Sequence, residues 1–303
     1  MSEAAAAGLT SIIVVAADSG PLLRECIASA LGSTATVEVI LVDNASGDGE
    51  VERVTVMHAD DARLRTLRNA TNLGFGPACN RGAAIARGDL LMFLNPDGLL
   101  QADSVARVRD VFDRNTGIGL LGVTVCDPDG KPARGIRRRD PTLRRALASL
   151  TGLARLESHW PSLAGVEVPP AIVATAAVEN VEAVSGACLT LPRRVFEQVG
   201  GFDEGYFLHV EDLDLCRRVR DAGHRVVIAH ALRVIHAQGS SSRHRPLFVA
   251  WHKHRGMWRY FRRFDPAARN PLLRVGVACG IGLHYLGAVT RHALGMLRKP
   301  PPG

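Results

Sequence analysis

Carboxylate side chains stand in this sequence where a predicted strand ends or a predicted helix begins. The segment VDNAS follows a strand predicted at residues 37–42, and its Asp43 can accept the imide N–H of a uracil or thymine base. Asn44 and Ser46 add polar groups there, although an Asx turn that closes the strand explains these residues equally well. Because α/β sheets bind ligands at the carboxyl ends of their strands, the segment predicts one wall of a nucleotide site.

A second motif, FLNPD, ends the strand predicted at residues 89–94. Asp97 leaves the carboxyl edge of the predicted sheet, and Asn95 stands two residues before it. Oxygen ligands of this kind suit Mg²⁺ or Mn²⁺ that bridges two phosphates. A metal held here would neutralise charge that develops on a departing diphosphate, so the motif predicts a divalent-metal site.

A third motif, EDLD, opens a helix predicted at residues 211–222. Asp212 and its neighbour Glu211 can supply a general base for an attacking hydroxyl. Acidic residues also favour the first turn of any helix, because they face the partial positive charge at its N-terminus. The motif by itself leaves both readings open.

A glycine-rich segment, NLGFGPACNRG at residues 72–82, precedes and begins another predicted helix. Glycine lets the backbone approach a ligand, and a helix start offers free N–H groups to a phosphate. The candidate substrate contacts in this segment are Asn72, Gly74, Phe75, Gly76 and Asn80. It is not a dinucleotide fingerprint, because Cys79 stands where the third small residue belongs. The literal GxGxxG at residues 117–122 follows a helix, the reverse of the required context.

Alternating strand and helix patterns position these motifs. We predict strands at 11–17, 37–42, 64–67 and 89–94 and helices at 75–87 and 103–114, which favours a mostly parallel sheet covered on both faces. Beyond a stretch at 130–180 without a clear period, we predict a strand at 181–191, helices at 192–199 and 211–222, and a strand at 225–229. Residues 246–298 have a helical pattern throughout.

Composition is that of an ordinary folded protein, with 303 residues, 47% of them hydrophobic and 22% charged. The six cysteines include no C-x-x-C pair, which predicts buried free thiols in a reducing, cytosolic compartment and indicates neither a zinc site nor a disulfide framework. The N-terminal alanine run lacks a basic flank and a long apolar core, so we expect no export. The formal charge of +7 is compatible with a diphosphate substrate, anionic lipid or nucleic acid.

Together the motifs resemble family 2 glycosyltransferases, in particular their bacterial rhamnosyltransferase-like branch. The segments VDNASGDG, NLGFGPACNRG, FLNPDG, SGACLTLPRRVFEQVGGFDEGYFLHVEDLDLCRRVRDAG and VIHAQGSSS occur in that family's order between residues 11 and 242. The resemblance implies an α/β GT-A fold and single-displacement inversion at the anomeric carbon of a sugar. It implies that Asp43 holds the donor base, and that Asp97 binds Mg²⁺ or Mn²⁺ as the last residue of a degenerate D-x-D motif. It makes Asp212 the catalytic base, and Glu211 a support of the acceptor site.

Further positions follow from the same resemblance. His236 matches a histidine that completes the metal site in some relatives, although a structural role at the end of a strand is the alternative. Gly186 and Arg243 fall in substrate-binding segments, the latter in a loop at 239–245 that covers the donor in relatives. Two departures stand out: Asp140 replaces a residue of an Arg-Phe-Pro motif, and the segment 15–18 lacks the usual aromatic beside the base.

The resemblance implies a nucleotide-diphosphate sugar as donor, and rhamnose from dTDP-rhamnose is the first expectation, with UDP- and GDP-sugars left open. The acceptor is expected to be a saccharide or lipid-linked saccharide used in cell-surface polysaccharide assembly. We expect a catalytic domain at 1–245, with a donor half at about 9–125 and an acceptor half at about 126–245, and a helical extension at 246–303. One alternative is a GT-A domain that binds nucleotide sugar without turnover. A nucleic-acid-binding protein is disfavoured because aromatic residues are only 5% of the chain.

The C-terminal extension predicts contact with the inner face of the cell membrane. Tryptophan and tyrosine alternate there with arginine and lysine between residues 251 and 263, a composition that favours an anionic lipid surface. Residues 275–290 carry no charged side chain but are fewer than the roughly 20 that a crossing needs. We therefore expect a peripheral cytoplasmic enzyme whose residues 246–298 lie on the membrane without spanning it. The alternative is that the aromatic side chains pack on the catalytic domain and the cations face water.

Overall fold

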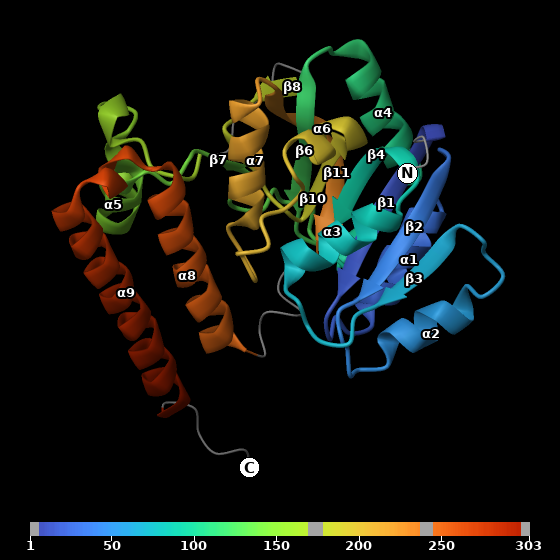
Figure 1. The fold of residues 1–303 in the computed structure, drawn as a ribbon, viewed down its shortest axis with the longest axis horizontal. Coiled ribbons are helices and arrows are strands. Elements are labelled where there is room, and N and C mark those ends of the chain that lie inside the picture. Colours follow the sequence, from blue (N-terminus) through green and yellow to red (C-terminus); the bar gives the residue numbers. More distant parts are fainter. Residues whose placement is uncertain (1–5, 169–177, 237–244, 298–303) are drawn as a thin grey trace.

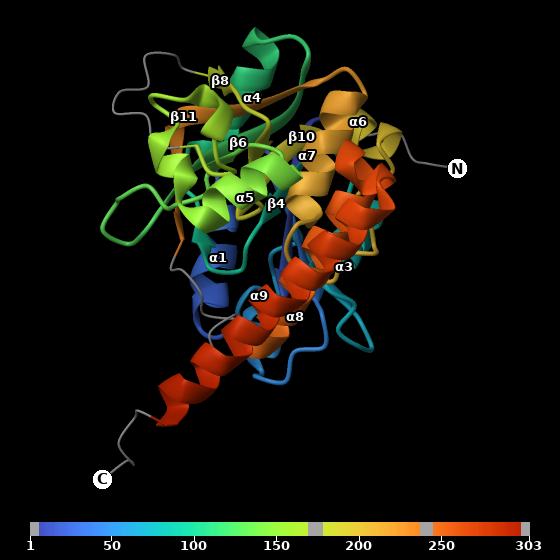
Figure 2. The same cartoon turned by 90° about the vertical axis from the view of Figure 1, so that its left-hand side faces the viewer.

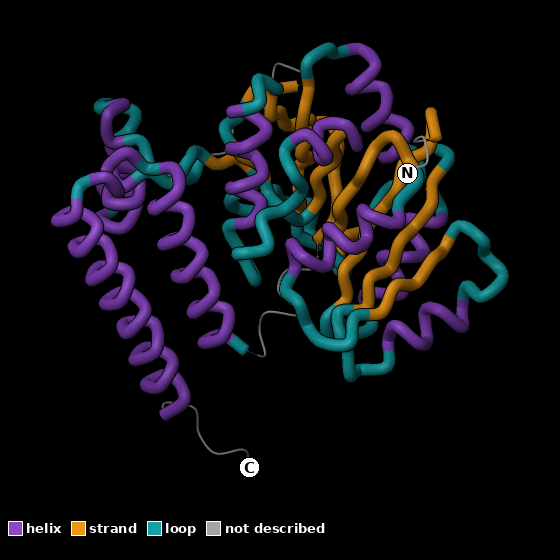
Figure 3. The backbone as a smooth tube through the Cα atoms, in the orientation of Figure 1, coloured by secondary structure: helices purple, strands orange, loops and turns teal. Residues whose placement is uncertain are grey.

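A computed structural model describes residues 6–168, 178–236 and 245–297, with side chains described as far as residue 293. Within these residues, nine strands form a central sheet in the order β3-β2-β1-β4-β10-β6-β11-β5, and β8 pairs with β11. Figure 1 shows this sheet on the side of the molecule away from the C-terminal helices, and Figure 3 shows helices on both of its faces. The prediction of a GT-A-like α/β architecture is confirmed.

The first half of the sheet is parallel. β1 (Ala6–Ala16) pairs with β2 (Val37–Asp43) and β4 (Gly88–Leu94), and β2 pairs with β3 (Leu64–Arg68). Alternate residues of β1 point to opposite faces: Ile13 packs with α3 (Phe75–Ile85), whereas Ile12 packs with α1 (Leu22–Leu31). α2 (Glu50–Met57) and α4 (Ser104–Arg114) share the face of α1. Both faces are thus buried, as near-continuous apolar strands require.

The second half of the sheet is mixed. β6 (Ile118–Cys126) is parallel to β11 (Arg225–His236), whereas β10 (Cys188–Pro192) runs antiparallel between β4 and β6. The short strands β5 (Gly98–Leu99) and β8 (Val178–Asn180) are antiparallel to β11. The longest pairings remain parallel, so the prediction of a mostly parallel sheet holds.

The single strand predicted at 181–191 is wrong. β9 (Ala183–Val184) leaves the main sheet to pair with β7 (Arg137–Arg138), and β10 starts only after a break at Ser185–Gly186. The break has a cause, because Gly186 turns its N–H toward the carboxylate of Asp212 at 2.9 Å. α6 (Arg193–Gln198) and α7 (Glu211–Asp221) then follow as predicted and cover the same face as α3.

The region without a clear sequence period contains short elements. α5 (Leu143–Thr151) is followed by two 3₁₀ turns, η1 (Leu153–Leu156) and η2 (Pro161–Leu163). The α5 N-terminus is tied to the C-terminal helices, since the backbone N–H of Leu143 donates to Asp265 Oδ2 at 2.5 Å. Figures 1 and 2 show α5 beside one end of the C-terminal helix pair.

The C-terminal region forms a helical hairpin of α8 (Pro246–Phe264) and α9 (Pro271–Leu297), joined through η3 (Pro266–Arg269). α8 is anchored on the body of the protein by the buried Tyr260 and Phe261, whereas no described side chain of α9 is buried. Figure 2 shows α9 extending well beyond the body. Cys279 on α9 is accordingly exposed, in contrast to the expectation for the cysteines, while the other five are buried.

The C-terminal helix is longer than its charge-free run and is not too short to cross a membrane. The charge-free run at 275–290 belongs to a longer helix, in which the 23 residues Pro271–Ala293 are long and apolar enough to cross a membrane by length and composition. Arg274 and Arg291 lie inside that stretch, which is why counting only charge-free residues gave too short a segment.

Candidate active site

The carboxyl ends of the parallel strands open into one cavity of about 2060 Å³. Ten of the predicted site residues line it: Asn44, Asn72, Gly74, Phe75, Asn95, Asp97, Gly186, Glu211, Asp212 and His236. Asp43, Ser46, Gly76 and Asn80 are not among its lining residues in the described chain, and Arg243 lies outside the described residues. The fold therefore brings together motifs that are up to about 190 positions apart in the sequence.

The carboxylate of Asp212 stands at the start of α7 and is almost saturated with donors. Its Oδ2 atom accepts the N–H of Gly186 at 2.9 Å and forms an ion pair with Arg138, and its Oδ1 atom accepts the N–H of Leu213 at 2.8 Å. Two carboxylate oxygens offer about four acceptor positions, so about one remains for an incoming hydroxyl. Only 8% of Asp212 is exposed, and the exposed part faces the cavity.

Glu211 and Asp212 have opposite electrostatic environments. Burial, with the adjacent charge of Asp212 as the next contribution, raises the pKa of Glu211 to about 8. Burial also acts to raise the pKa of Asp212, but the charge and hydrogen bond of Arg138 outweigh it and hold that pKa below its ordinary value. Two neighbouring carboxyl groups with pKa values pushed apart assign different protonation states at neutral pH. Asp212 is the ionised member, and Glu211 is the protonated one.

The raised pKa of Glu211 has a consequence for stability. Between its ordinary value of about 4.3 and about 8, the folded protein holds this proton more tightly than the unfolded chain, so the free energy of unfolding falls as the pH rises. We expect Glu211→Gln to remove this fall in the free energy of unfolding. The fall is worth about 1.4 kcal/mol for each unit by which the pKa is raised. Denaturant unfolding at pH 5 and pH 8.5 measures it.

Glu197→Gln is the matched control for this prediction, because it makes the same chemical change at a glutamate whose side chain is 58% exposed. The control should follow the wild-type pH dependence. If Glu211→Gln also loses stability in parallel with the wild type between the two pH values, then another group carries the proton.

Asp97 and His236 come together through strand pairing. His236 at the end of β11 is paired with Gly98 of β5, and its Nε2 atom lies 2.9 Å from Asp97 Oδ1. Asn95 Nδ2 is 3.2 Å from the same imidazole nitrogen. Carboxylate and imidazole are both common ligands of divalent metals, so the chemistry of this pair fits a divalent cation.

Within the described chain, no group of three His, Cys, Asp or Glu side chains forms a complete cation site. Mg²⁺ in particular is held by one or two carboxylates together with substrate phosphates, so an incomplete protein site is consistent with a metal that arrives with a diphosphate. Asp97 and His236 are the residues that would hold it.

Asp43 closes its strand. Its Oδ1 atom accepts the N–H of Ser46 at 2.9 Å, and its Oδ2 atom lies 3.3 Å from Arg68 Nη1. This is the turn that the sequence left open as an alternative to base binding, and only 6% of the residue is exposed. The predicted contact of Asp43 with a donor base stays a prediction.

Asn44 ties the end of β2 to the glycine-rich loop. Its Nδ2 donates to Asn72 Oδ1 at 3.0 Å and to the carbonyl of Gly74 at 3.1 Å, while its Oδ1 accepts the N–H of Leu73. Gly74 has a φ of 92°, and a Cβ there would lie 2.4 Å from the carbonyl oxygen of Phe207. Only glycine fits this approach, which brings the loop against the segment that leads into Glu211.

Asn80 and Gly76 hold α3 against the 201–204 loop. Asn80 Oδ1 accepts the N–H of Phe202 at 2.8 Å and its Nδ2 donates to the Phe202 carbonyl at 2.9 Å, while a Cβ on Gly76 would lie 3.2 Å from Phe202 Cβ. These contacts give both residues a role in packing, and their predicted contacts with substrate stay predictions.

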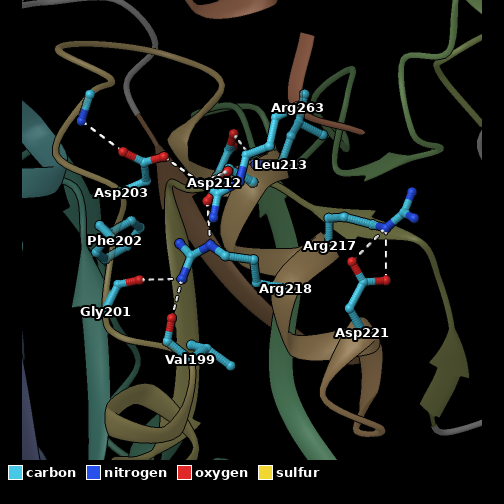
Figure 4. A network of polar contacts seen from close by, with 12 residues as sticks. Val199, Gly201, Phe202, Asp203, Asp212, Leu213, Arg217, Arg218, Asp221 and Arg263 are labelled. Carbon is cyan, nitrogen blue, oxygen red and sulfur yellow. Dashed lines mark hydrogen bonds and ion pairs between the residues drawn. The ribbon is translucent and has the colours of Figure 1, made fainter. Parts of the chain in front are cut away.

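The first turn of α7 is held in place by a network of hydrogen bonds and ion pairs. Figure 4 shows Arg218 reaching from α7 to the carbonyl oxygens of Val199 at 2.6 Å and Gly201 at 2.7 Å. The same guanidinium pairs with the fully buried Asp214 at 2.5 Å, which Arg263 of α8 also contacts at 3.1 Å. Breaking a buried pair of this kind leaves an uncompensated charge, so this network fixes the position of Glu211 and Asp212.

Backbone strain is concentrated at the cavity. Within the described residues, four non-glycine residues have left-handed backbone angles: Asp18 (φ 53°), Ala45 (φ 61°), His209 (φ 65°) and Val210 (φ 75°). Asp18, His209 and Val210 line the cavity, and Ala45 follows the lining residue Asn44. A β-branched valine in this region is a true outlier, and such outliers cluster where a site needs a fixed geometry.

Sequence reasoning missed Arg138, which stands 74 positions from Asp212 and is held by the β7–β9 pairing. The only available signal was the run Arg137–Arg139, in which nothing distinguishes the middle residue. The departure at Asp140 is explained by the structure, because that buried carboxylate pairs with Arg217 and Arg220 of α7 and accepts the hydroxyl of Tyr260.

The known proteins that are similar to this chain include glycosyltransferases. Residues 11–160 match the family model described as glycosyl transferase family 2. An N-acetylglucosaminyl-diphospho-decaprenol L-rhamnosyltransferase of Mycobacterium tuberculosis is 29% identical over 272 residues, which cover 82% of this chain and 86% of the relative. The O-antigen biosynthesis protein RfbC of Myxococcus xanthus is 31% identical over 239 residues, which cover 77% of this chain but 18% of RfbC.

Two solved structures share the fold. The mannosyltransferase PcManGT from Pyrobaculum calidifontis, in complex with GDP-Man and Mn²⁺, has a TM-score of 0.57 at 18% identity and covers 97% of this chain and 76% of its own. GalNAc-T7 with UDP, GalNAc and Mn²⁺ has a TM-score of 0.58 at 16% identity and covers 75% of this chain and 43% of its own. With the ordered motifs, the cavity and these similarities, the chain belongs to the family 2 glycosyltransferases and is a glycosyltransferase with the GT-A fold.

Proposed function

We propose that this enzyme transfers a sugar, with rhamnose from dTDP-rhamnose as the first candidate, to a hydroxyl of a diphosphate-linked lipid saccharide with inversion of the anomeric centre. The observation that carries the proposal is one cavity that contains both an ionised carboxylate at Asp212 and the Asp97–His236 pair. Similarity to a rhamnosyltransferase over most of both chains supports the choice of sugar and acceptor.

In this mechanism the acceptor hydroxyl attacks the anomeric carbon while its proton passes to Asp212. The bond between that carbon and the diphosphate oxygen breaks, and the nucleoside diphosphate leaves with the electron pair. A divalent metal, when bound, supplies positive charge that stabilises the departing diphosphate. Asp97 and His236 would hold the metal. Arg138 keeps Asp212 ionised, and the protonated Glu211 can donate a hydrogen bond in the acceptor site.

A donor panel tests this proposal. With Mn²⁺ present, we expect the purified full chain to hydrolyse dTDP-rhamnose slowly in the absence of acceptor, and faster than it hydrolyses UDP-glucose, UDP-N-acetylglucosamine or GDP-mannose. Release of nucleoside diphosphate measures the rates. Preference for a UDP- or GDP-sugar would overturn the choice of donor, and tight donor binding without any turnover would favour a domain that only binds nucleotide sugar.

We also propose a cytoplasmic enzyme that meets the membrane through residues 246–298. Trp251 is 50% exposed on α8, and Val275 and Leu283 are 63% and 70% exposed on α9. Apolar side chains exposed at this density mark a lipid or protein contact, and a lipid-linked acceptor brings the enzyme to a membrane surface.

A further inference from the structure

The cavity that contains Glu211 and Asp212 does not end at the acceptor side. It continues as a trough between α5 and the α8–α9 hairpin, lined by Leu143, Leu147 and Leu150 of α5 and by Met257 and Phe261 of α8. The α9 wall consists of Leu272, Leu273, Gly276, Val277, Gly280 and Ile281. These positions recur at intervals of three and four residues, so they form one face of the helix. The catalytic site is thus continuous with an apolar surface.

The trough is open to solvent along its apolar walls. Leu147 and Leu150 are 51% and 64% exposed, and Leu272 is 81% exposed. A Cβ added at Gly276 or Gly280 would meet no atom within 4 Å. The open space beside these glycines leaves room for an apolar ligand, and apolar exposure on this scale is unfavourable unless something covers it.

Cations without partners lie along the same cavity. Arg134, Arg155 and Lys253 line it, and their side chains make no hydrogen bond or ion pair with the described residues. Lys253 lies where the catalytic part of the cavity meets the apolar trough. On the catalytic side, His209 lies near both Asp212 and Lys253. Burial lowers the pKa of His209, the charge of Asp212 acts to raise it, and the charge of Lys253 lowers it. On the hairpin side, the next residue, His254, places its Nε2 atom 2.7 Å from His284 Nδ1 of α9.

We propose that this trough binds the hydrocarbon tail of the acceptor, with the acceptor diphosphate at Lys253 and the acceptor sugar at Asp212. The inference rests on the proposed function for the identity of the acceptor, and it adds where the lipid lies. The order of groups along the cavity, from carboxylate to unpaired cation to apolar walls, matches the order of sugar, diphosphate and isoprenyl chain in such a molecule.

Two of the glycines of α9, Gly280 and Gly282, give a matched pair of variants. Gly280 faces the trough, whereas Gly282 does not line it, and a Cβ at either position meets nothing within 4 Å. Two residues along an α-helix differ by about 200°, so the two positions point to nearly opposite sides. Gly280→Phe and Gly282→Phe therefore add the same apolar group to the same helix, but only Gly280→Phe fills the trough.

The test is calorimetric binding of farnesyl diphosphate and ethyl diphosphate to the full chain, below the concentration at which the farnesyl compound forms micelles. The wild type should bind the farnesyl compound about 100-fold more tightly, because apolar surface is buried. Gly280→Phe should reduce this preference about 10-fold or more, while Gly282→Phe should leave it unchanged. Ethyl diphosphate should bind all three proteins equally. Equal affinities of the two variants for farnesyl diphosphate would overturn the proposal that the trough binds the hydrocarbon tail.

Flotation with anionic vesicles distinguishes a tail site from a bilayer contact. The wild type and Gly280→Phe should float equally, since both retain the same exposed face of α9 away from the trough, whereas Gly282→Phe adds an apolar side chain to that face and should float at least as well. If Gly280→Phe changes flotation but not farnesyl diphosphate binding, the apolar walls face a bilayer and not a single chain, and the proposal is wrong. If the proposed function is wrong but the trough binds an apolar chain, the protein will turn over no nucleotide sugar and will still prefer farnesyl diphosphate to ethyl diphosphate.

Discussion

Asp212→Asn should lower turnover by about 10²–10⁴-fold, the usual contribution of a general base, while the affinity for the nucleotide-sugar donor stays nearly unchanged. The amide retains the shape of the carboxylate but cannot take the proton of the acceptor hydroxyl. Asp212 contacts Arg138, Gly186 and Leu213, none of which belongs to the Asp97–His236 pair that we propose for the metal. Single-turnover kinetics with saturating donor, together with calorimetry of donor binding, separates the two effects.

Asp221→Asn is the matched control, since it makes the same change in the last turn of the same helix at a side chain that is 50% exposed. This variant should turn over normally. Near-normal turnover of Asp212→Asn with tight donor binding would transfer the role of base to Glu211, and the pH profile would then require a group with a pKa near 8. Loss of donor binding in Asp212→Asn would mean that the substitution had disturbed the fold around Arg138.

Asp97→Ala should abolish the Mn²⁺-dependent part of nucleoside diphosphate binding. A metal contributes several kcal/mol to the stabilisation of phosphate charge, so the loss corresponds to about 100-fold in affinity or more. The fold should survive, because His236 remains paired through the β11–β5 strand pairing and retains Asn95 as a neighbour. Calorimetry with thymidine diphosphate, in Mn²⁺ and in EDTA, measures the metal-dependent difference.

His236→Ala should reduce the difference between thymidine diphosphate binding in Mn²⁺ and in EDTA, since the Nε2 atom of His236 lies 2.9 Å from the Asp97 carboxylate. Asp103→Ala, at a side chain that is 58% exposed before α4, is the control and should bind as the wild type does. An unchanged metal dependence in Asp97→Ala would remove Asp97 from the metal site.

Features that depend on one element were determined by the sequence alone. Apolar runs of strand length predicted β1, β2 and β4, and the polar segment that ends β4 predicted that Asp97 would line the site. Periodicity works here because alternation along a strand or helix reports which face is buried, and this depends on residues close in sequence. Five motifs in order identified the family for the same reason, since each is a local segment.

Features that depend on pairs of distant residues were decided only by the tertiary structure. Arg138 reaches Asp212 because β7 pairs with β9, and no local pattern marks that residue. The glycine-rich loop meets Phe207 only because α3 and α7 cover the same face of the sheet. One contact that ties α5 to the hairpin joins Leu143 to Asp265, which are 122 positions apart in the sequence.

The division of labour between Glu211 and Asp212 shows the physical reason most clearly. In sequence they are two adjacent carboxylates with similar ordinary pKa values. Burial raises the pKa of Glu211 to about 8, while a guanidinium from a distant strand lowers that of Asp212. Desolvation and Coulomb energy depend on distances in three dimensions, so chemistry at this site could be located from the sequence but its protonation states could not.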